Sequence, residues 1–128
     1  MSVAIVKVVK DLVAASAAPL VLGILAEGDN YGYAIIQRVS RLSSGQLEWS
    51  EGLLYPLLHR LERLGQVESI WGTAESGRRR KYYRITTQGR AALAEQRRAW
   101  RAVDATLEAL SQTLQHLVRP IRELGSPT

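Results

Sequence analysis

The chain has 128 residues, which suits one compact domain with a hydrophobic core and is short for two. It contains no cysteine, which excludes disulfides, thiolate nucleophiles and thiolate zinc sites. Lys and Arg number 17 against 12 Asp and Glu, and the resulting net charge of +5 favours a polyanionic partner.

An uncharged segment covers residues 12–26. It is shorter than the roughly 20 residues that span a membrane, so a buried helix fits better than a membrane span or a secretory segment. The apolar spacing predicts this helix over residues 16–26, with Ser16 as N-cap and Pro19 in the first turn. Upstream, residues 3–15 fit either an earlier helical arm or a strand.

Two further helices joined by a turn are predicted next. Asp29 and Asn30 are both suitable N-caps for a helix over residues 31–42, after which a Ser-Ser-Gly sequence breaks the pattern. Ser50 can cap a third helix that ends at Gly65. The leucines of this third helix recur on one face and predict a buried stripe: Leu54, Leu57, Leu58, Leu61 and Leu64.

Beyond the third helix the pattern changes to that of a β-hairpin. Residues 67–71 and 82–86 are rich in β-branched and aromatic side chains, and residues 72–77 form the loop between them. The returning arm opens with Arg-Arg-Arg-Lys at residues 78–81, which we call the basic run. It is the strongest cluster of positive charge in the sequence.

A last, long helix is capped by Thr86 or Thr87. Its apolar residues alternate spacings of three and four, which is the pattern of a heptad seam, and Pro120 is expected to limit its length. The seam predicts a short packed dimer helix with these interface residues: Trp100, Val103, Leu107, Leu110, Leu114 and Leu117, followed by Ile121.

The order helix, helix, turn, helix, hairpin is that of a winged helix-turn-helix. The predicted fold is therefore mainly α with a small β-hairpin wing, plus a long C-terminal dimerisation helix. Residues 1–87 would form the DNA-binding domain with its N-terminal helical arm, and residues 88–121 the dimerisation helix. Residues 122–128 would form a disordered tail.

Such a domain places one helix in the major groove of DNA and lays the hairpin along the backbone or the minor groove. The third helix carries polar side chains opposite its leucine stripe, and the basic run suits phosphate contacts. The predicted DNA-binding residues are Tyr31, Ser50, Tyr55, His59, Arg60, Arg78, Arg79, Arg80 and Lys81.

Each of these residues also has a structural alternative. Ser50 is an N-cap in either case, and Tyr55 fits a half-buried position. Arg60 and Arg63 fit solvated positions or ion pairs with neighbouring glutamates. The basic run would also keep a hairpin edge soluble, although four consecutive cations exceed what that task needs.

The sequence argues against an enzyme. Its two histidines, His59 and His116, have no second ligand at metal spacing, and no glycine-rich phosphate loop follows a strand. We therefore expect no catalytic residue, no metal and no cofactor.

Residues 20–89 resemble the PadR family of winged helix-turn-helix regulators. The resemblance is carried by LAEG at 25–28 with YGY at 31–33, by SEGLLYPLLHRLE at 50–62, and by GRRRKYYR at 77–84 leading to Thr86 and Gly89. It implies a cytoplasmic homodimer that binds operator DNA and is not bound to a membrane. The alternative is a protein-interaction module that has kept the winged-helix shape without reading DNA.

The sequence WRAVD at residues 100–104 is similar to the short PadR subfamily that contains multidrug-sensing repressors. This similarity implies a repressor released by a small aromatic effector bound at the dimer interface. The effector-binding residues carried over from it are Leu12, Ala15, Ala18, Trp100 and Asp104. Trp100 would equally serve as a core residue of the dimer seam.

Three features depart from the family pattern. Leu53 stands where the family commonly has threonine, which removes a hydroxyl that could touch DNA, and Pro19 interrupts a helix that is usually continuous. Arg97 and Arg101 flank Trp100 and disfavour cationic ligands. The operator and the charge of any effector therefore do not follow from the resemblance.

Overall fold

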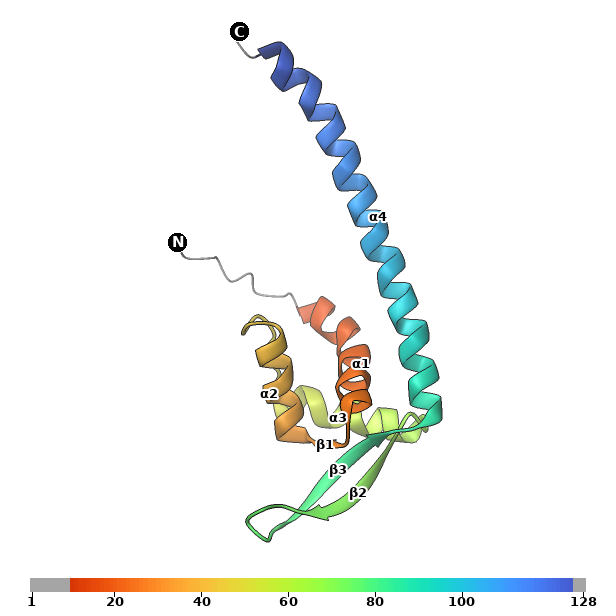
Figure 1. Ribbon diagram of the computed structural model, residues 1–128. Coiled ribbons are helices and arrows are strands. Elements are labelled where there is room, and N and C mark those ends of the chain that lie inside the picture. The colour runs from red at the N-terminus through yellow and green to blue at the C-terminus, as the bar shows by residue number, and fades with distance from the viewer. Residues whose placement is uncertain (1–9, 126–128) are drawn as a thin grey trace. The chain divides into compact units, whose positions relative to one another are not determined.

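The computed structural model describes residues 10–125, with side chains to residue 117. This part of the chain forms four α-helices and a three-stranded antiparallel sheet (Figure 1). The chain divides into two compact units, Met1–Ala94 and Glu95–Thr128. The predicted fold class, mainly α with a β-hairpin wing and a long C-terminal helix, is confirmed. In chain order the elements are α1 (Lys10–Glu27), β1 (Asn30–Tyr31), α2 (Gly32–Leu42), α3 (Glu51–Arg63), β2 (Val67–Thr73), β3 (Arg79–Ile85) and α4 (Thr87–Gly125).

Helix α1 starts earlier than predicted and passes through Pro19. The prediction that Ser16 caps it is wrong, because the Ser16 hydroxyl donates to the carbonyl oxygen of Leu12 at 2.7 Å. A serine inside a helix makes this bond readily, since the carbonyl four residues earlier lies within its reach. Residues 10–15 are therefore helical, whereas residues 3–9 of the predicted arm or strand lie outside the described residues.

The start of α2 also differs from the prediction that Asp29 or Asn30 is its N-cap. Asn30 and Tyr31 form β1 instead, and Tyr31 precedes α2 without a side-chain cap. The Asp29 carboxylate accepts hydrogen bonds from the Arg84 guanidinium, with the shortest at 2.8 Å. This bidentate, charge-assisted pair uses the carboxylate more fully than a single backbone N–H would.

Helix α3 follows its prediction at both ends. The Ser50 Oγ accepts a hydrogen bond from the backbone N–H of Leu53 at 3.2 Å, so its capping role is confirmed. Gly65, with φ of +73°, provides the left-handed turn after the helix. Leu64 is wrongly assigned to the buried stripe, since it occupies the C-cap and is 56% exposed. The other four leucines of the stripe are buried.

The β2–β3 hairpin, which we call the wing, is longer than predicted. Its pairing runs from Val67 opposite Ile85 to Thr73 opposite Arg79, and β1 pairs with the outer side of β3. Residues 79–81 of the basic run therefore lie in a strand. The end of the wing extends beyond helices α1, α2 and α3 (Figure 1).

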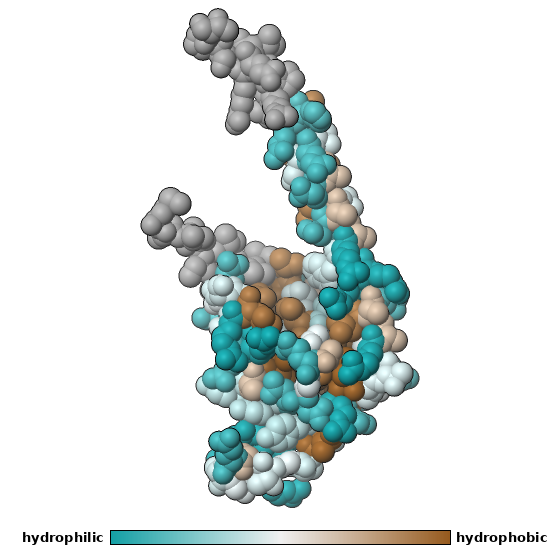
Figure 2. All heavy atoms as spheres, in the orientation of Figure 1, coloured by the Kyte–Doolittle hydropathy of each residue, from teal (hydrophilic) through white to brown (hydrophobic). Residues whose placement is uncertain are grey.

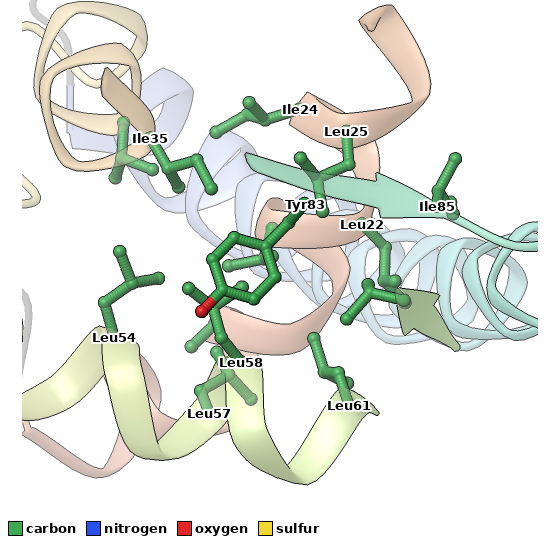
Figure 3. Packing of buried hydrophobic residues seen from close by; sticks show 14 of the residues in the cluster. Leu22, Ile24, Leu25, Ile35, Leu54, Leu57, Leu58, Leu61, Tyr83 and Ile85 are labelled. Atoms are coloured by element: carbon green, nitrogen blue, oxygen red, sulfur yellow. The ribbon is translucent and has the colours of Figure 1, made fainter. Parts of the chain in front are cut away.

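Tyr83 lies at the centre of the hydrophobic core of the first unit (Figure 3). It is 1% exposed and points from β3 toward the helices. Because side chains alternate along a strand, Val67 and Ile85 share its face of the sheet. Helices α1 and α3 cover that face with these residues: Leu22, Leu25, Leu54, Leu58 and Leu61.

Helix α4 begins after Thr86, whose Oγ1 accepts a hydrogen bond from the backbone N–H of Gly89 at 3.0 Å. Of the two threonines predicted as the cap, Thr86 is therefore the one that caps α4. Pro120 does not end the helix, which continues to Gly125. Residues 122–125, expected in a disordered tail, are helical, and residues 126–128 lie outside the described part of the chain.

Candidate DNA-binding surface

One face of α3 is open to solvent, opposite its buried leucines. Its exposed side chains include Glu51, Pro56, His59, Arg60 and Arg63. Ser50, just before the helix, is exposed as well, and its hydroxyl keeps a proton to donate because the cap bond uses only the oxygen. This face therefore offers several hydrogen-bond donors on a helix of the size that a major groove admits.

Neither Arg60 nor Arg63 forms an ion pair within the described residues. Glu62, the glutamate beside them, accepts a hydrogen bond from the Ser69 hydroxyl at 2.7 Å instead. Both guanidinium groups are exposed in the last turn of α3. Their charges are therefore available to an external anion.

Tyr55 is half-buried, as its structural alternative expected, and its ring packs against the hydrophobic core. Its phenol group lies so close to Gly32 that a Cβ at this glycine would collide with it. Gly32 is the first residue of α2. Tyr55 therefore holds α3 against the start of α2, and only part of its side chain is open to a ligand.

The wing carries basic side chains on both faces. In β3, Arg79 and Lys81 share the sheet face of Tyr83, whereas Arg80 lies on the opposite face. The Arg79 guanidinium carbon is 4.7 Å from the centroid of the Trp71 ring, and the Lys81 Nζ is 5.5 Å from that of Tyr83. Both distances are within the range of cation–π interactions.

Tyr31 is brought to the wing, but its ring is partly covered. The Arg80 guanidinium carbon lies 3.9 Å from the centroid of the Tyr31 ring. The Tyr82 ring meets that of Tyr31 edge-on, with 5.7 Å between centroids. Tyr31 is half-buried in this arrangement and connects the wing to the segment that precedes α2.

Arg78 stands at the end of the wing, where the chain turns. Its side chain is exposed, and its carbonyl oxygen accepts a hydrogen bond from the backbone N–H of Ala74 at 2.9 Å. Gly77, with φ of +87°, allows the tight turn between them. Hydrophilic and neutral residues cover the end of the wing in the lower part of Figure 2.

Two ion pairs of the first unit were not foreseen from the sequence. Arg84 pairs with Asp29 at 2.8 Å, and Arg38 pairs with Glu27 at 2.7 Å. The hydrogen bond from Arg38 lowers the pKa of Glu27, and the hydrogen bond to Asp29 raises the pKa of Arg84. Each pair joins segments distant in sequence, so local patterns gave no signal. These pairs leave the charges of the basic run unneutralised among the described residues.

The structure adds exposed side chains that the sequence interpretation did not include. Trp71 is 58% exposed beside Arg79. On α2, Tyr33, Gln37 and Arg41 are exposed and recur every four residues, which places them on one side of the helix. Their spacing was visible in the sequence, but the sequence analysis used only the apolar residues of this helix and assigned no role to its exposed face.

The residues predicted for the effector and the dimer interface fall in both compact units. In the first unit, Leu12 and Ala15 are exposed and Ala18 is half-buried on α1. In the second unit, Asp104 is exposed, and the predicted interface residues form an exposed row that we call the α4 stripe: Trp100, Val103, Leu107, Leu110, Leu114 and Leu117. The side chain of Ile121 lies outside the described residues.

Neither a membrane span nor a metal centre was found in the part of the chain searched. No described helix combines the length and apolar character needed to cross a bilayer. Likewise, no group of three or more His, Cys, Asp or Glu side chains among the described residues is placed to hold a metal ion.

Comparison with solved structures shows the same architecture in known regulators. A transcriptional regulator from Clostridium thermocellum aligns with a TM-score of 0.71 and 29% identity, over 77% of this chain and 96% of that one. A PadR-like transcriptional regulator from Bacillus cereus also aligns with a TM-score of 0.71, at 28% identity over 80% and 98% of the two chains.

Sequence comparison agrees. The transcriptional regulator Rv3488 of Mycobacterium tuberculosis is 43% identical over 74 residues, which are 58% of this chain and 65% of the relative. An uncharacterised protein of Lysinibacillus sphaericus is 32% identical over 82% of this chain and 96% of its own length. The family model of PadR-like transcriptional regulators matches residues 21–95. PadR-family proteins are DNA-binding regulators and not enzymes, and this chain belongs to the PadR-like family of transcriptional regulators.

Proposed function

We propose that this regulator is a dimeric repressor that reads its operator with α3 and grips the flanking phosphates with the wing. The observation that carries the proposal is the basic run, which holds exposed and half-buried cations without an ion pair among the described residues. Cations of this kind add to the affinity for DNA when they contact phosphates, because binding releases the counterions condensed on DNA. The exposed face of α3 would supply the base contacts. A cytoplasmic location is part of the same proposal.

A second copy of the chain would cover the α4 stripe. In the single chain every residue of the stripe is more than one third exposed, from Trp100 at 37% upward. An apolar row at heptad spacing is the surface by which two helices pack together. Dimerisation would then present two α3 helices and two wings to the two halves of one operator.

Release from DNA would follow from an effector that binds near Trp100. The indole ring offers a flat apolar surface and Asp104, one helical turn later, offers a carboxylate. Arg97 and Arg101 oppose a cationic ligand, so a neutral aromatic molecule is favoured. The effector must bind the DNA-competent and the incompetent dimer with different affinities, since otherwise it shifts nothing.

Fluorescence anisotropy tests the proposed function with labelled duplexes of equal length: the DNA upstream of the regulator's own gene, several other candidate upstream segments, and a scrambled duplex. We expect tighter binding to the upstream duplex, by about a thousandfold, and a steep fall of both affinities with added salt. Equal affinity for several candidate upstream duplexes and for scrambled DNA would contradict sequence-specific regulation. Affinity that does not change with salt would contradict phosphate binding by the wing.

A further inference from the structure

The three arginines of the basic run stand in different surroundings. Arg79 and its aromatic neighbour Trp71 are both exposed, on the sheet face near the end of the wing. Arg80 and its aromatic neighbour Tyr31 are both half-buried, on the opposite face. Arg78 lies in the turn and contacts no aromatic ring among the described residues. The wing therefore holds one exposed and one partly enclosed arginine–aromatic pair.

The strand register explains why the two pairs differ. Trp71 is opposite Lys81, and Arg79 is opposite Thr73, so all four side chains project from one face, beyond the last core residue. On the other face, Arg80 is opposite Gly72. The absence of a side chain at Gly72 lets the Tyr82 ring lie close to the backbone, where a Cβ would be 2.8 Å from it.

Tyr82 thereby extends the half-buried pair into a packed group. Its ring and that of Tyr31 meet edge to face, Arg80 covers the Tyr31 ring, and β1 pairs Tyr31 directly opposite Tyr82. Tyr31 is followed at once by α2. Arg80 therefore joins the wing to the segment that precedes α2. Gly32, the first residue of α2, in turn contacts Tyr55 of α3.

A cation–π contact has a specific consequence for an exposed arginine. The aromatic ring restrains the long side chain but accepts none of the five guanidinium N–H donors in an ordinary hydrogen bond. Arg79 forms no ion pair with another described residue. Its donors are consequently oriented in advance and free for a bidentate acceptor such as a phosphate group.

We propose that Trp71 orients Arg79 as a phosphate-contacting residue of the wing, whereas Arg80 positions the wing through Tyr31 and does not itself contact DNA. This inference rests on the proposed function, because it assigns roles within the DNA-binding surface. Trp71 and Arg80 are positioning residues in this scheme. DNA phosphate is the anion chosen because Arg78 and Arg79 are exposed, without ion pairs among the described residues, at the end of a projecting hairpin, where a row of phosphates can reach both.

The test measures the affinity for a labelled duplex of mixed sequence between about 50 and 200 mM salt, since phosphate contacts do not depend on sequence. The variants are Arg79→Ala, Trp71→Leu, Trp71→Phe, Arg80→Ala and Tyr31→Leu. The double variant Trp71→Leu/Arg79→Ala completes a double-mutant cycle, which measures the coupling between the two residues. Arg98→Ala, which removes one exposed cation from α4, is the matched charge control. Circular dichroism melting checks that each variant folds.

Arg79→Ala is expected to reduce the slope of log affinity against log salt by about 0.9 for each wing bound. Trp71→Leu should weaken binding about two- to fivefold, whereas Trp71→Phe, which keeps an aromatic ring, should bind nearly as tightly as the wild type. In the double variant, Trp71→Leu should weaken binding no further than Arg79→Ala does alone. Arg80→Ala and Tyr31→Leu should weaken binding about threefold or more and keep the wild-type slope, as Arg98→Ala does.

The inference is overturned if the effects of Trp71→Leu and Arg79→Ala add independently, or if Arg80→Ala lowers the salt slope as much as Arg79→Ala. In either case the wild-type protein would still bind DNA, and the proposed function would stand. A wild-type protein without any salt-dependent binding to duplex DNA would overturn both this inference and the proposed function. A Tyr31→Leu variant that folds and binds like the wild type would remove the positioning role of Arg80.

Discussion

Leu107→Asp is expected to convert the proposed dimer into monomers and to abolish tight operator binding. Leu107 lies in the middle of the α4 stripe and is 59% exposed in the single chain. Burying one leucine contributes about 2 kcal/mol, and a symmetric dimer loses this contribution twice when both copies change. Two facing carboxylates add repulsion, so the dimer dissociation constant should rise at least about a hundredfold. Analytical ultracentrifugation measures it, and anisotropy measures operator affinity.

Gln112→Asp provides the matched control for this variant. Gln112 is exposed and lies five residues after Leu107, on the helix face away from the stripe. The same carboxylate there should leave the dimer and operator affinity as in the wild type. A folded Leu107→Asp protein that stays dimeric would refute the assigned interface. A proven monomer that binds the operator tightly would refute the link between dimerisation and DNA reading.

Tyr83→Ala is expected to remove about 3–5 kcal/mol from the free energy of unfolding, because it leaves a cavity at the centre of the core. Tyr83 is among the largest fully buried side chains of the described residues and contacts leucines from α1 and α3 (Figure 3). Urea unfolding at a fixed protein concentration measures the loss, since a dimer's apparent stability depends on concentration.

Tyr83→Phe separates the ring from its hydroxyl. The Tyr83 hydroxyl forms no hydrogen bond with another side chain among the described residues, and burial raises the pKa of its phenol, which stays neutral at pH 7. We expect Tyr83→Phe to unfold within about 1 kcal/mol of the wild type. A large loss in Tyr83→Phe would assign stability to the hydroxyl as well as to the ring, and little loss in Tyr83→Ala would show that the packing of Tyr83's ring does not hold the wing to the helices.

The elements of the fold could be predicted where one periodicity dominates the sequence. The leucine spacing of α3 and the Ser50 cap are local signals, and both are confirmed. The change to alternating residues after Gly65 indicated the wing for the same reason. Leu64 follows the spacing of the stripe, but the helix has ended there, so its exposure depends on where the chain turns.

The errors arise where a polar side chain has a second suitable partner besides the backbone N–H that it was predicted to cap. Asp29 is a good N-cap by type, yet its carboxylate binds Arg84, which lies 55 positions away in sequence. Ser16 stands before an apolar run, yet the helix continues upstream and its hydroxyl bonds within it. No rule based on neighbouring residues distinguishes these outcomes, because both side chains have two suitable partners.

The candidate site also combines a feature that local sequence shows with features that depend on the folded structure. The basic run was evident from composition, but the sequence treated its members as equivalent. Only the strand register separates Arg79 from Arg80 and places each against a different ring. Tyr31 and Tyr55, predicted as DNA contacts, are half-buried residues that hold the wing and α3 to the start of α2. Their contacts with DNA stay a prediction.

A hydroxyl-radical footprint of the regulator on the DNA upstream of its own gene tests the central claim most directly. Two α3 helices and two wings on one dimer predict two symmetric protected segments, with centres about 10 base pairs or a multiple of that apart. Arg79→Ala should weaken protection at the outer edges of both segments while their centres stay protected. A single asymmetric protected segment, or protection that is the same on scrambled DNA, would contradict the account.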